Sequence, residues 1–354
     1  MEFDEALRKA EREDTLDLQD IVALLQAEGE EKKTLFGVAD SYRQKYVGDE
    51  VHLRGLVEFS NYCARGCLYC GLRAPNRKLV RYRMALEEIV RAAVHAEELG
   101  IKTVVLQSGE DPYYTSERLI EIVKTIKEAA DVAITLSIGE RPREEYRALR
   151  AAGSDRYLLR HETADPDLYA NLHPDMRYER RLECLHDLRA EGFQVGAGCM
   201  VGLPGQTLEA LAKDIILLRE LDVDMAGIGP FIPHPNTPLG GYPAGDVDMT
   251  LKVIALARIA TRDAHIPATT ALATADPFGR EKAFNAGANV VMPNLTPLEY
   301  RRYYEIYPNK RCISEDIDRC LPCLKQRIEA NGRRIGTSYG HSLKYRQINA
   351  EATA

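Results

Sequence analysis

Short apolar runs and amphipathic stretches alternate along most of this chain, and this alternation constrains the fold more than any other feature. Eight runs have the apolar pattern of buried strands: residues 51–59, 103–107, 133–137, 156–160, 194–200, 225–231, 267–271 and 289–293. Stretches with apolar residues at helical spacing lie between them, as expected of parallel strands joined by helical crossovers. Eight such units predict an α/β fold of the closed (β/α)8 class, a TIM barrel. An open doubly wound sheet is the alternative, although no G-x-G-x-x-G sequence follows a strand and opens a helix.

The 354-residue chain carries these units without a Ser/Gly-rich linker or a long run of charge. We expect an N-terminal helical extension over 1–46, the barrel over 47–311 and a C-terminal extension over 312–354. Fold analogy places the N-terminal helix at the bottom of the barrel, as a cap.

The composition excludes several classes of function. The formal net charge is −7, and basic residues are spread along the chain and balanced by Asp and Glu, so neither nucleic acid nor an anionic membrane is an expected partner. The opening residues are acidic and helical and have no secretory pattern. No apolar stretch approaches the roughly 20 residues that a membrane-spanning helix needs. We therefore expect a cytoplasmic protein.

The eight cysteines fall into two tight triplets and two single residues. In a cytoplasmic chain they are more readily metal ligands or buried thiols than disulfides. The first triplet is Cys63, Cys67 and Cys70, in SNYCARGCLYCG, and the second is Cys312, Cys320 and Cys323. Cys184 and Cys199 stand alone and are expected to be small buried hydrophobic residues. The pattern indicates two metal sites.

The first triplet has one thiolate fewer than a fully cysteine-ligated 4Fe–4S cluster requires. An open iron can bind a substrate or cofactor, much as a catalytic zinc retains an open position. The triplet follows the first predicted strand, so it should lie at the mouth of the barrel, where such folds place their chemistry. A zinc site or a set of structural thiols is the alternative; a zinc ion would prefer a fourth ligand, and the closest histidine is His95, inside a predicted helix.

Cys-x3-Cys-x2-Cys, with Tyr69 before the third cysteine, resembles the signature of the radical S-adenosylmethionine (SAM) superfamily. The resemblance implies a 4Fe–4S cluster whose open iron chelates SAM. It also implies reductive cleavage of SAM to methionine and a 5′-deoxyadenosyl radical, with the protein orienting the cofactors and excluding water.

Further segments resemble the HydE family of FeFe-hydrogenase maturases over about residues 45–340. They are YCGLR, VLQSGEDPYY, RYLLRHETADP, GAGCMVGLPGQT, GIGPFIPHPNTPL, IPATTAL and ANVVMPNLTP. The resemblance implies action on a small anionic or organometallic substrate, an iron carbonyl/cyanide synthon bound by cysteine. It also implies possible partners in the maturases HydG and HydF, and a one-electron donor such as ferredoxin or flavodoxin. Biotin synthase-like and methylornithine synthase-like enzymes of small-metabolite biosynthesis share the motif and are the alternative. An iron–sulfur electron carrier is a third class, although carriers are usually small and ligate every iron with protein thiolates.

The resemblance also assigns roles by position. Cys63, Cys67 and Cys70 would be the catalytic cluster ligands. Residues expected to contact SAM are Tyr69, Ser108, Gly109, Glu110, Glu162, Arg181 and Met200. Residues expected to contact substrate are Thr135, Arg160, Thr269, Thr270 and Tyr304. The Arg181 guanidinium is suited to a bidentate grip on a carboxylate. A solvated helix charge is the alternative for Arg181, and a structural ion pair for Arg160.

The second triplet matches members of the family that carry an accessory cluster, 2Fe–2S or 4Fe–4S. Zinc or free thiols remain alternatives there. His161 and His234 lie on predicted mouth segments, where they would donate hydrogen bonds to substrate or serve in packing.

Overall fold

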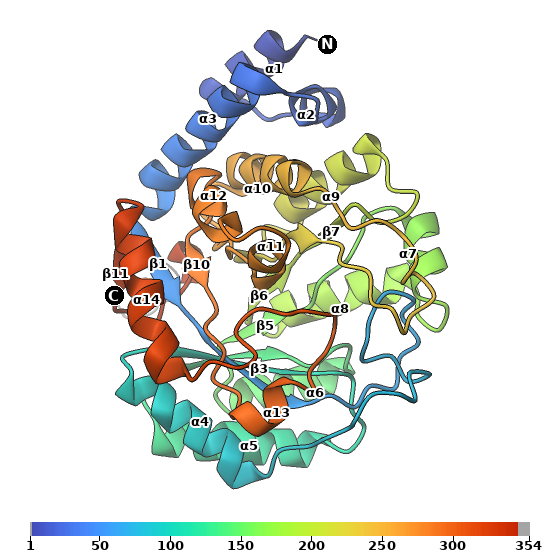
Figure 1. The fold of residues 1–354 in the computed structure, drawn as a ribbon, viewed down its shortest axis with the longest axis vertical. Helices are drawn as coiled ribbons and strands as arrows, with labels where there is room; N and C mark the ends of the chain where they lie inside the picture. Colours follow the sequence, from blue (N-terminus) through green and yellow to red (C-terminus); the bar gives the residue numbers. More distant parts are fainter. Residues whose placement is uncertain (1, 346–354) are drawn as a thin grey trace.

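The computed structural model describes residues 2–345, and its centre is a barrel of parallel strands surrounded by helices (Figure 1). Six consecutive parallel strands form most of the wall: β2 (Gly55–Ser60), β3 (Thr103–Ser108), β4 (Ala133–Ser137), β5 (Arg156–Leu158), β6 (Gln194–Ala197) and β8 (Met225–Ala226). Five short strands accompany them: β1 (Glu50–Leu53), β7 (Met200–Val201), β9 (Gly229–Pro230), β10 (Val290–Val291) and β11 (Arg334–Gly336). The predicted α/β class is confirmed.

Single-residue bridges close the ring between β8 and β2. Met225 of β8 bridges His265, Pro267 bridges Val290 of β10, and β10 pairs with β1, all in parallel. The segment 265–267 therefore occupies the position of the seventh barrel strand, and β10 is the eighth. The predicted closed (β/α)8 barrel is confirmed, and the open sheet is excluded.

Four predicted strands differ clearly from those observed. The runs 194–200 and 225–231 are each divided in two, into β6 and β7 and into β8 and β9. The run 51–59 is divided at Arg54 into β1 and β2, because β1 pairs with β10 and β11 whereas β2 pairs with β3. The prediction of a strand over 267–271 is wrong beyond Pro267. Thr269 caps a helix instead, since its hydroxyl oxygen accepts a hydrogen bond from the Leu272 N–H at 3.3 Å.

The helices of the outer layer follow the strands in alternation. They are α4 (Leu86–Glu98), α5 (Ser116–Ala129), α6 (Arg143–Ala151), α7 (Pro166–Leu172), α8 (Tyr178–Ala190), α9 (Leu208–Glu220), α10 (Val247–Thr261), α11 (Thr270–Ala275), α12 (Gly279–Asn285), α13 (Leu298–Arg301) and α14 (Ile317–Ala330). Side-chain caps fix several of their starts: Thr207 begins α9 and Asp246 begins α10. Most of their apolar faces pack on the strands in one large core, and Leu172 of α7 belongs to a smaller cluster with Met200 and Phe231. No helix of residues 2–345 has both the length and the apolar character needed to cross a membrane.

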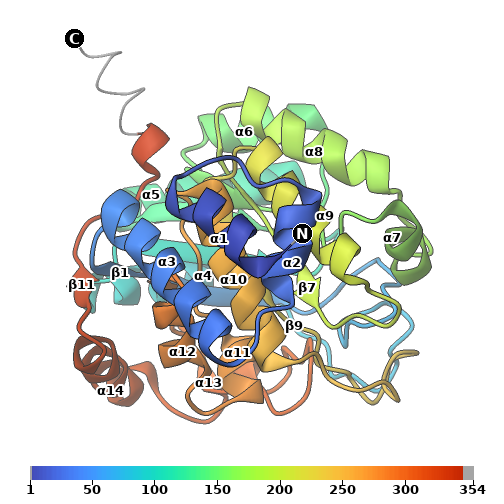
Figure 2. The ribbon, with the colours of Figure 1, turned by 90° about the horizontal axis from the view of Figure 1, so that it is seen from above.

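The N-terminal helices lie on the side of the barrel, which corrects the expectation that they cap its bottom. They are α1 (Phe3–Glu11), α2 (Leu18–Leu25) and α3 (Gly29–Val47). Helix α3 packs on α10 and α12, and α2 packs on α9 and α10, so the three helices form an added layer over that face (Figures 1 and 2).

The C-terminal segment closes the bottom of the barrel. The Tyr339 carbonyl oxygen accepts hydrogen bonds from Thr103 Oγ1 at 2.8 Å and from Arg156 Nη2 at 2.6 Å. The Ser342 N–H donates to Gln194 Oε1 at 2.8 Å. Thr103, Arg156 and Gln194 begin β3, β5 and β6, so the segment crosses the amino ends of these strands and leaves the opposite mouth open for a site. The end of the predicted C-terminal extension, 346–354, lies outside the described residues.

Candidate active site

The first cysteine triplet lies on a loop at the carboxyl end of β2, at the mouth of the barrel. Backbone hydrogen bonds fasten the loop to three neighbouring segments: Ala64 N–H to Glu110 O at 2.9 Å, Leu68 N–H to Leu172 O at 2.9 Å and Gly71 N–H to Ile306 O at 3.0 Å. The Gly66 N–H donates to the Asp175 carboxylate at 3.1 Å. The loop is therefore held in place by contacts that do not use its thiols.

The three thiols of the loop are more widely spaced than the ligands of one bound zinc ion. Zinc–sulfur bonds of about 2.3 Å in a tetrahedron would place thiolates roughly 3.8 Å apart. Among residues 2–345, the trio of ligand atoms found within 4.8 Å of one another is that of His161, Cys199 and Asp214. Neither cysteine triplet is that compact. Burial raises the pKa of the Cys70 thiol to about 12, and burial also raises the pKa of Cys63 and Cys67. Iron ligation would therefore displace protons from these thiols.

One cavity of about 340 Å³ opens beneath the loop and runs into the barrel. All the barrel residues predicted to bind cluster, cofactor or substrate line it: Cys63, Cys67, Cys70, Tyr69, Ser108, Gly109, Glu110, Thr135, Arg160, Glu162, Arg181, Met200, Thr269, Thr270 and Tyr304. The fold thus brings together residues from nearly every segment of the mouth.

The cavity wall presents buried polar atoms that no protein group satisfies. Glu162 Oε2, Thr135 Oγ1 and two nitrogens of Arg160 have no hydrogen-bond partner among the described residues. Arg160 Nη2 lies 3.0 Å from Glu162 Oε2, close enough for an ion pair but poorly aligned for a hydrogen bond. Buried polar groups are normally hydrogen-bonded, so Thr135 Oγ1 and Arg160 Nε, which no described protein group reaches, favour a polar ligand in the cavity. A carboxylate, a cation and a hydroxyl side by side fit a ligand with both charges, such as SAM, and an anionic substrate.

Glu162 has an unusual backbone. Its φ is +69°, in the left-handed region, which costs a non-glycine residue about 1–2 kcal/mol. Two hydrogen bonds hold it there: the Glu162 N–H donates to Gly198 O at 2.9 Å, and the Met200 N–H donates to Glu162 O at 3.1 Å. Strain kept in this way at a cavity wall is typical of a functional residue.

Arg181 is fixed by protein groups, which alters its expected use. Its Nε donates to Glu140 Oε1 at 2.8 Å, and its Nη1 donates to the Arg160 carbonyl oxygen. Its Nη2 makes no hydrogen bond to a protein oxygen within residues 2–345, so a bidentate grip on a ligand carboxylate would use the remaining Nη1 and Nη2 hydrogens. Glu140 was missed in the sequence. The available signal was its position three residues after Ser137, where the predicted strand 133–137 ends. The prediction of a solvated helix charge does not hold, because Arg181 is buried.

A line of alternating charges joins the cluster loop to Arg181. Arg65 of the loop forms an ion pair with Glu110 and lies 3.7 Å from Glu140. The Glu140 N–H also donates to Glu110 Oε1 at 3.0 Å. Gly109 is needed beside this network, because a Cβ there would lie 2.2 Å from the Tyr62 carbonyl oxygen. The loop and the segment after β3 are therefore locked together.

Tyr69 is oriented by a histidine that the sequence did not single out. The His173 ring accepts a hydrogen bond from the Tyr69 hydroxyl at 2.9 Å, and its other nitrogen donates to the Tyr169 carbonyl oxygen at 3.0 Å. Burial lowers the pKa of His173 to about 4, so the ring is neutral at physiological pH. The Tyr69 ring is thereby fixed beside the third cluster cysteine.

The remaining predicted residues also line the cavity, and two of them do so from a helix instead of a strand. Thr269 and Thr270 line the cavity from the start of α11 and not from a strand end. Tyr304 is buried, and the Lys310 ammonium lies 5.1 Å from its ring centroid. Met200 packs with Leu172 and other apolar residues at the edge of the cavity.

Four residues that the sequence analysis singled out lie outside the cavity. Cys184 and Cys199 are fully buried, as predicted. His161 and His234 are also buried, but neither lines the cavity. Of the two roles expected for these histidines, their burial outside the cavity supports packing and not hydrogen bonding to substrate.

The second triplet lies away from the cavity. Cys320 and Cys323 are on one face of α14, and Cys312 is on the preceding loop with φ +63°. A hydrogen bond from the Cys320 thiol lowers the pKa of Cys312, aided by the Arg280 guanidinium. The arrangement offers three thiols near the surface.

Comparison with known proteins gives consistent results. Residues 57–218 match the Radical SAM superfamily. The chain is 54% identical over 308 residues to the FeFe hydrogenase maturase subunit HydE of Thermotoga maritima, covering 87% of this chain and 88% of that protein. The crystal structure of methylornithine synthase (PylB) matches with a TM-score of 0.83 at 27% identity, covering 99% of this chain and 100% of that one. HydG, a maturase of the FeFe hydrogenase, matches with a TM-score of 0.82 at 20% identity, covering 98% of this chain and 80% of that one, and supports the fold alone.

Proposed function

The chain belongs to the HydE family of radical SAM enzymes, and from that premise we propose that it acts in FeFe-hydrogenase maturation. The proposed reaction is reductive cleavage of SAM, followed by attack on an iron carbonyl/cyanide synthon bound by cysteine. The observation that carries the proposal is the cavity, which has cluster thiols at its mouth and unsatisfied Arg160 and Thr135 atoms on its wall. The identity to a HydE maturase over most of both chains supports the substrate class.

A 4Fe–4S cluster with SAM bound to its open iron supplies the 5′-deoxyadenosyl radical after one-electron reduction. The chain's own residues hold and orient the reactants. Cys63, Cys67 and Cys70 ligate the cluster. SAM contacts come from Tyr69, Ser108, Gly109, Glu110, Glu162, Arg181 and Met200. Because the cavity is enclosed by the barrel, the same residues exclude water from a reactive intermediate.

The substrate lies deeper, against polar side chains of the cavity wall, among which Thr135 Oγ1 and Arg160 Nε have no hydrogen-bond partner within residues 2–345. Arg160 supplies a positive charge, and Thr135, Thr269 and Thr270 supply hydroxyl groups. Tyr304 also lines the cavity. A small anion is the ligand that this set of donors would bind most tightly, since a hydrogen bond to a charged group is stronger than one between neutral groups.

The direct test is complementation of FeFe-hydrogenase maturation in a system that lacks HydE. We expect active hydrogenase when this chain is supplied with the maturases HydG and HydF, which are its proposed partners. Good SAM cleavage without hydrogenase activity would instead favour a small-metabolite enzyme of the biotin synthase or methylornithine synthase kind. Failure of SAM cleavage by the reconstituted protein would favour the electron-carrier class.

The accessory cysteines Cys312, Cys320 and Cys323 are proposed to hold a second iron–sulfur cluster, with a fourth ligand from water or elsewhere. Free thiols in both triplets require a reducing compartment, and we therefore propose that the protein acts in the cytoplasm.

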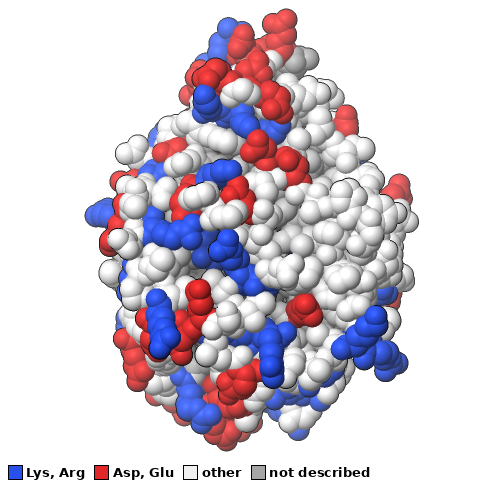
Figure 3. All heavy atoms as spheres, viewed as in Figure 1, with Lys and Arg blue, Asp and Glu red and all other residues white. Residues whose placement is uncertain are grey.

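A basic segment beside the cluster loop is the proposed docking surface for the one-electron donor. Residues 63–86 contain six Lys and Arg and no Asp or Glu, in a chain whose net charge is −7. Arg65 and Arg83 pair with carboxylates, whereas the Arg73, Arg77, Lys78 and Arg81 side chains have no carboxylate within 4.0 Å among residues 2–345. Figure 3 shows Lys and Arg at the edge where Figure 1 draws the light-blue loops of this region. An acidic ferredoxin or flavodoxin is the complementary partner.

Reversing the charge of the two exposed members should weaken electron delivery. For Arg77→Glu/Lys78→Glu we expect SAM cleavage driven by an acidic flavodoxin to fall roughly tenfold at low ionic strength, because steering by charge is lost. Cleavage driven by dithionite should be unchanged, and added salt should narrow the difference between the variant and the original protein. The matched control is Arg8→Glu/Lys33→Glu, on exposed positions of the N-terminal helices. Equal loss with both reductants would contradict a docking role.

A further inference from the structure

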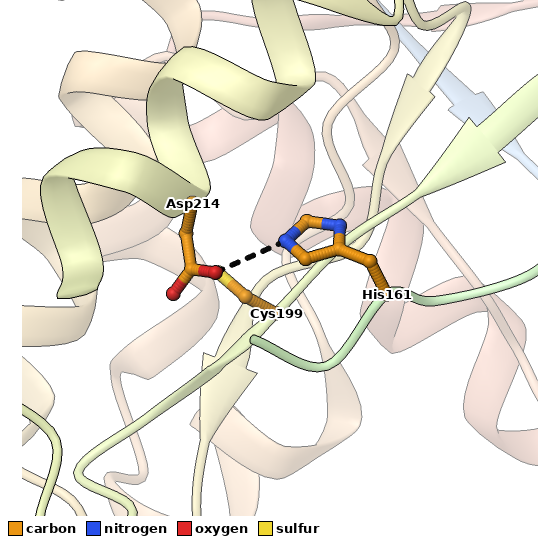
Figure 4. A group of neighbouring side chains, drawn as sticks. All are labelled: His161, Cys199 and Asp214. Atoms are coloured by element: carbon orange, nitrogen blue, oxygen red, sulfur yellow. Dashed lines mark hydrogen bonds and ion pairs between the residues drawn. The ribbon is translucent and has the colours of Figure 1, made fainter. Parts of the chain in front are cut away.

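Behind the cavity wall lies a trio of fully buried polar residues: His161, Cys199 and Asp214 (Figure 4). They come from three different elements. His161 follows β5, Cys199 precedes β7, and Asp214 projects from α9. His161 Nε2 lies 3.2 Å from Asp214 Oδ1. The trio resembles a metal site at first inspection, because its three ligand atoms all lie within 4.8 Å of one another.

The hydrogen bonds of the ring oppose metal binding. The Gly198 N–H donates to His161 Nδ1 at 3.3 Å, so Nδ1 has no hydrogen and the ring hydrogen is on Nε2, facing Asp214. A metal on Nε2 would move that hydrogen to Nδ1, where it would face the Gly198 N–H. Two donors would then oppose each other in a buried site, which is costly. His161 therefore donates to Asp214.

Asp214 binds the chain on both sides of Glu162. Its Oδ1 accepts from His161 on the near side and from the Ala164 N–H on the far side. Gln206 Nε2 lies 3.5 Å from its other oxygen. Glu162, which lies between these two hydrogen-bonded residues, has a φ of +69°.

His161 is tied in turn to the strand that Glu162 pairs with. Its Nδ1 bonds to Gly198, whose carbonyl oxygen receives the Glu162 N–H at 2.9 Å. The backbone of Glu162 is thus enclosed by a ring of hydrogen bonds that begins and ends on Asp214. Its side chain, on the other face, reaches the cavity beside Arg160.

We propose that Asp214 and His161 are positioning residues: together they hold Glu162 in the left-handed conformation that directs its carboxylate into the cavity. This inference rests on the proposed role of Glu162 in binding SAM. The pair touches neither cofactor nor substrate and acts through Glu162 alone.

The test is equilibrium binding of SAM to the cluster-loaded protein, combined with thermal unfolding. Asp214→Ala and His161→Leu each remove one partner, and either variant that folds is sufficient. We expect SAM affinity to fall about tenfold or more, as for other outer-shell changes. Asp214→Asn keeps an oxygen that accepts from His161 and Ala164, so most of the affinity should be retained. The matched control is Asp224→Ala, which removes a buried carboxylate at the amino end of β8 that accepts from the Val195 N–H. It should lower the melting temperature but leave SAM affinity unchanged.

A double-mutant cycle separates positioning from a general loss of structure. In a Glu162→Gln background, adding Asp214→Ala should cause no further loss of SAM affinity, because the pair acts through Glu162. An equal further loss in that background would overturn the inference, as would tight SAM binding by both His161→Leu and Asp214→Ala. If Glu162→Gln itself binds SAM normally, it is the proposed role of Glu162 that fails.

Discussion

Cys67→Ser will abolish SAM cleavage by the reconstituted, dithionite-reduced protein. Cys67 is the middle one of the three proposed cluster ligands, so its loss would leave two anchors for a cluster that already has an open iron. A serine hydroxyl is a poor iron ligand, because it is not ionised at neutral pH. We expect formation of 5′-deoxyadenosine to fall by more than about 100-fold, since even changes to outer-shell groups cost 10–100-fold at metal sites. Chromatographic assay of 5′-deoxyadenosine, with the iron content per chain, is the measurement.

The matched control is Cys184→Ser, the same chemical change at a fully buried thiol on α8. Cys184 lies outside the cavity, so this variant should lose about 1 kcal/mol of stability and keep SAM cleavage. A triple serine variant at Cys312, Cys320 and Cys323 should lower the iron content and still cleave SAM with dithionite. Full cleavage by Cys67→Ser would refute the assignment of the catalytic cluster.

Features carried by neighbouring residues were predictable from the sequence. The cluster loop needs only three thiols within eight residues after a strand, and the barrel needs only regular alternation. The helix start at Thr269 was misread, since β-branched residues in PATTA favour a strand as strongly as threonine favours a cap.

Contacts between residues that lie far apart in the sequence could not be predicted from it. The partner of Arg181 is Glu140, and the residues that Tyr339 joins at the bottom of the barrel are Thr103 and Arg156. No periodicity relates such pairs, because they meet only after the barrel has closed. For the same reason, the sequence could not predict the hydrogen bonds that Asp214 of α9 makes on both sides of Glu162.

The second large prediction concerns an ion pair between two residues that lie still farther apart in the sequence. Lys310, on the segment that crosses the mouth of the barrel, forms an ion pair with Glu58 of β2, and both side chains are at most 4% exposed. The other Glu58 oxygen accepts from Asn294 Nδ2 at 3.0 Å. Both members line the cavity. Lys310 thus fastens the segment across the mouth to the barrel wall.

Lys310→Met should destabilise the protein by about 3–5 kcal/mol, because it leaves the Glu58 carboxylate buried without its cation. For a chain of this length, the loss corresponds to a melting temperature lower by about 4–7 °C. Circular dichroism of the cluster-free protein measures the unfolding without interference from iron loss. Lys33→Met, which removes one partner of an exposed ion pair with Glu30, is the control and should cost well under about 1 kcal/mol.

The double variant Glu58→Gln/Lys310→Met distinguishes the burial of charge from the loss of packing. If the unpaired carboxylate causes the loss, removing its charge as well should recover most of the stability, because a neutral glutamine can still accept the hydrogen bond from Asn294. If the double variant unfolds as early as Lys310→Met, the lysine stem and its contact with the Tyr304 ring are what stabilise the segment. A Lys310→Met loss no larger than that of Lys33→Met would mean that the mouth is open to water in solution.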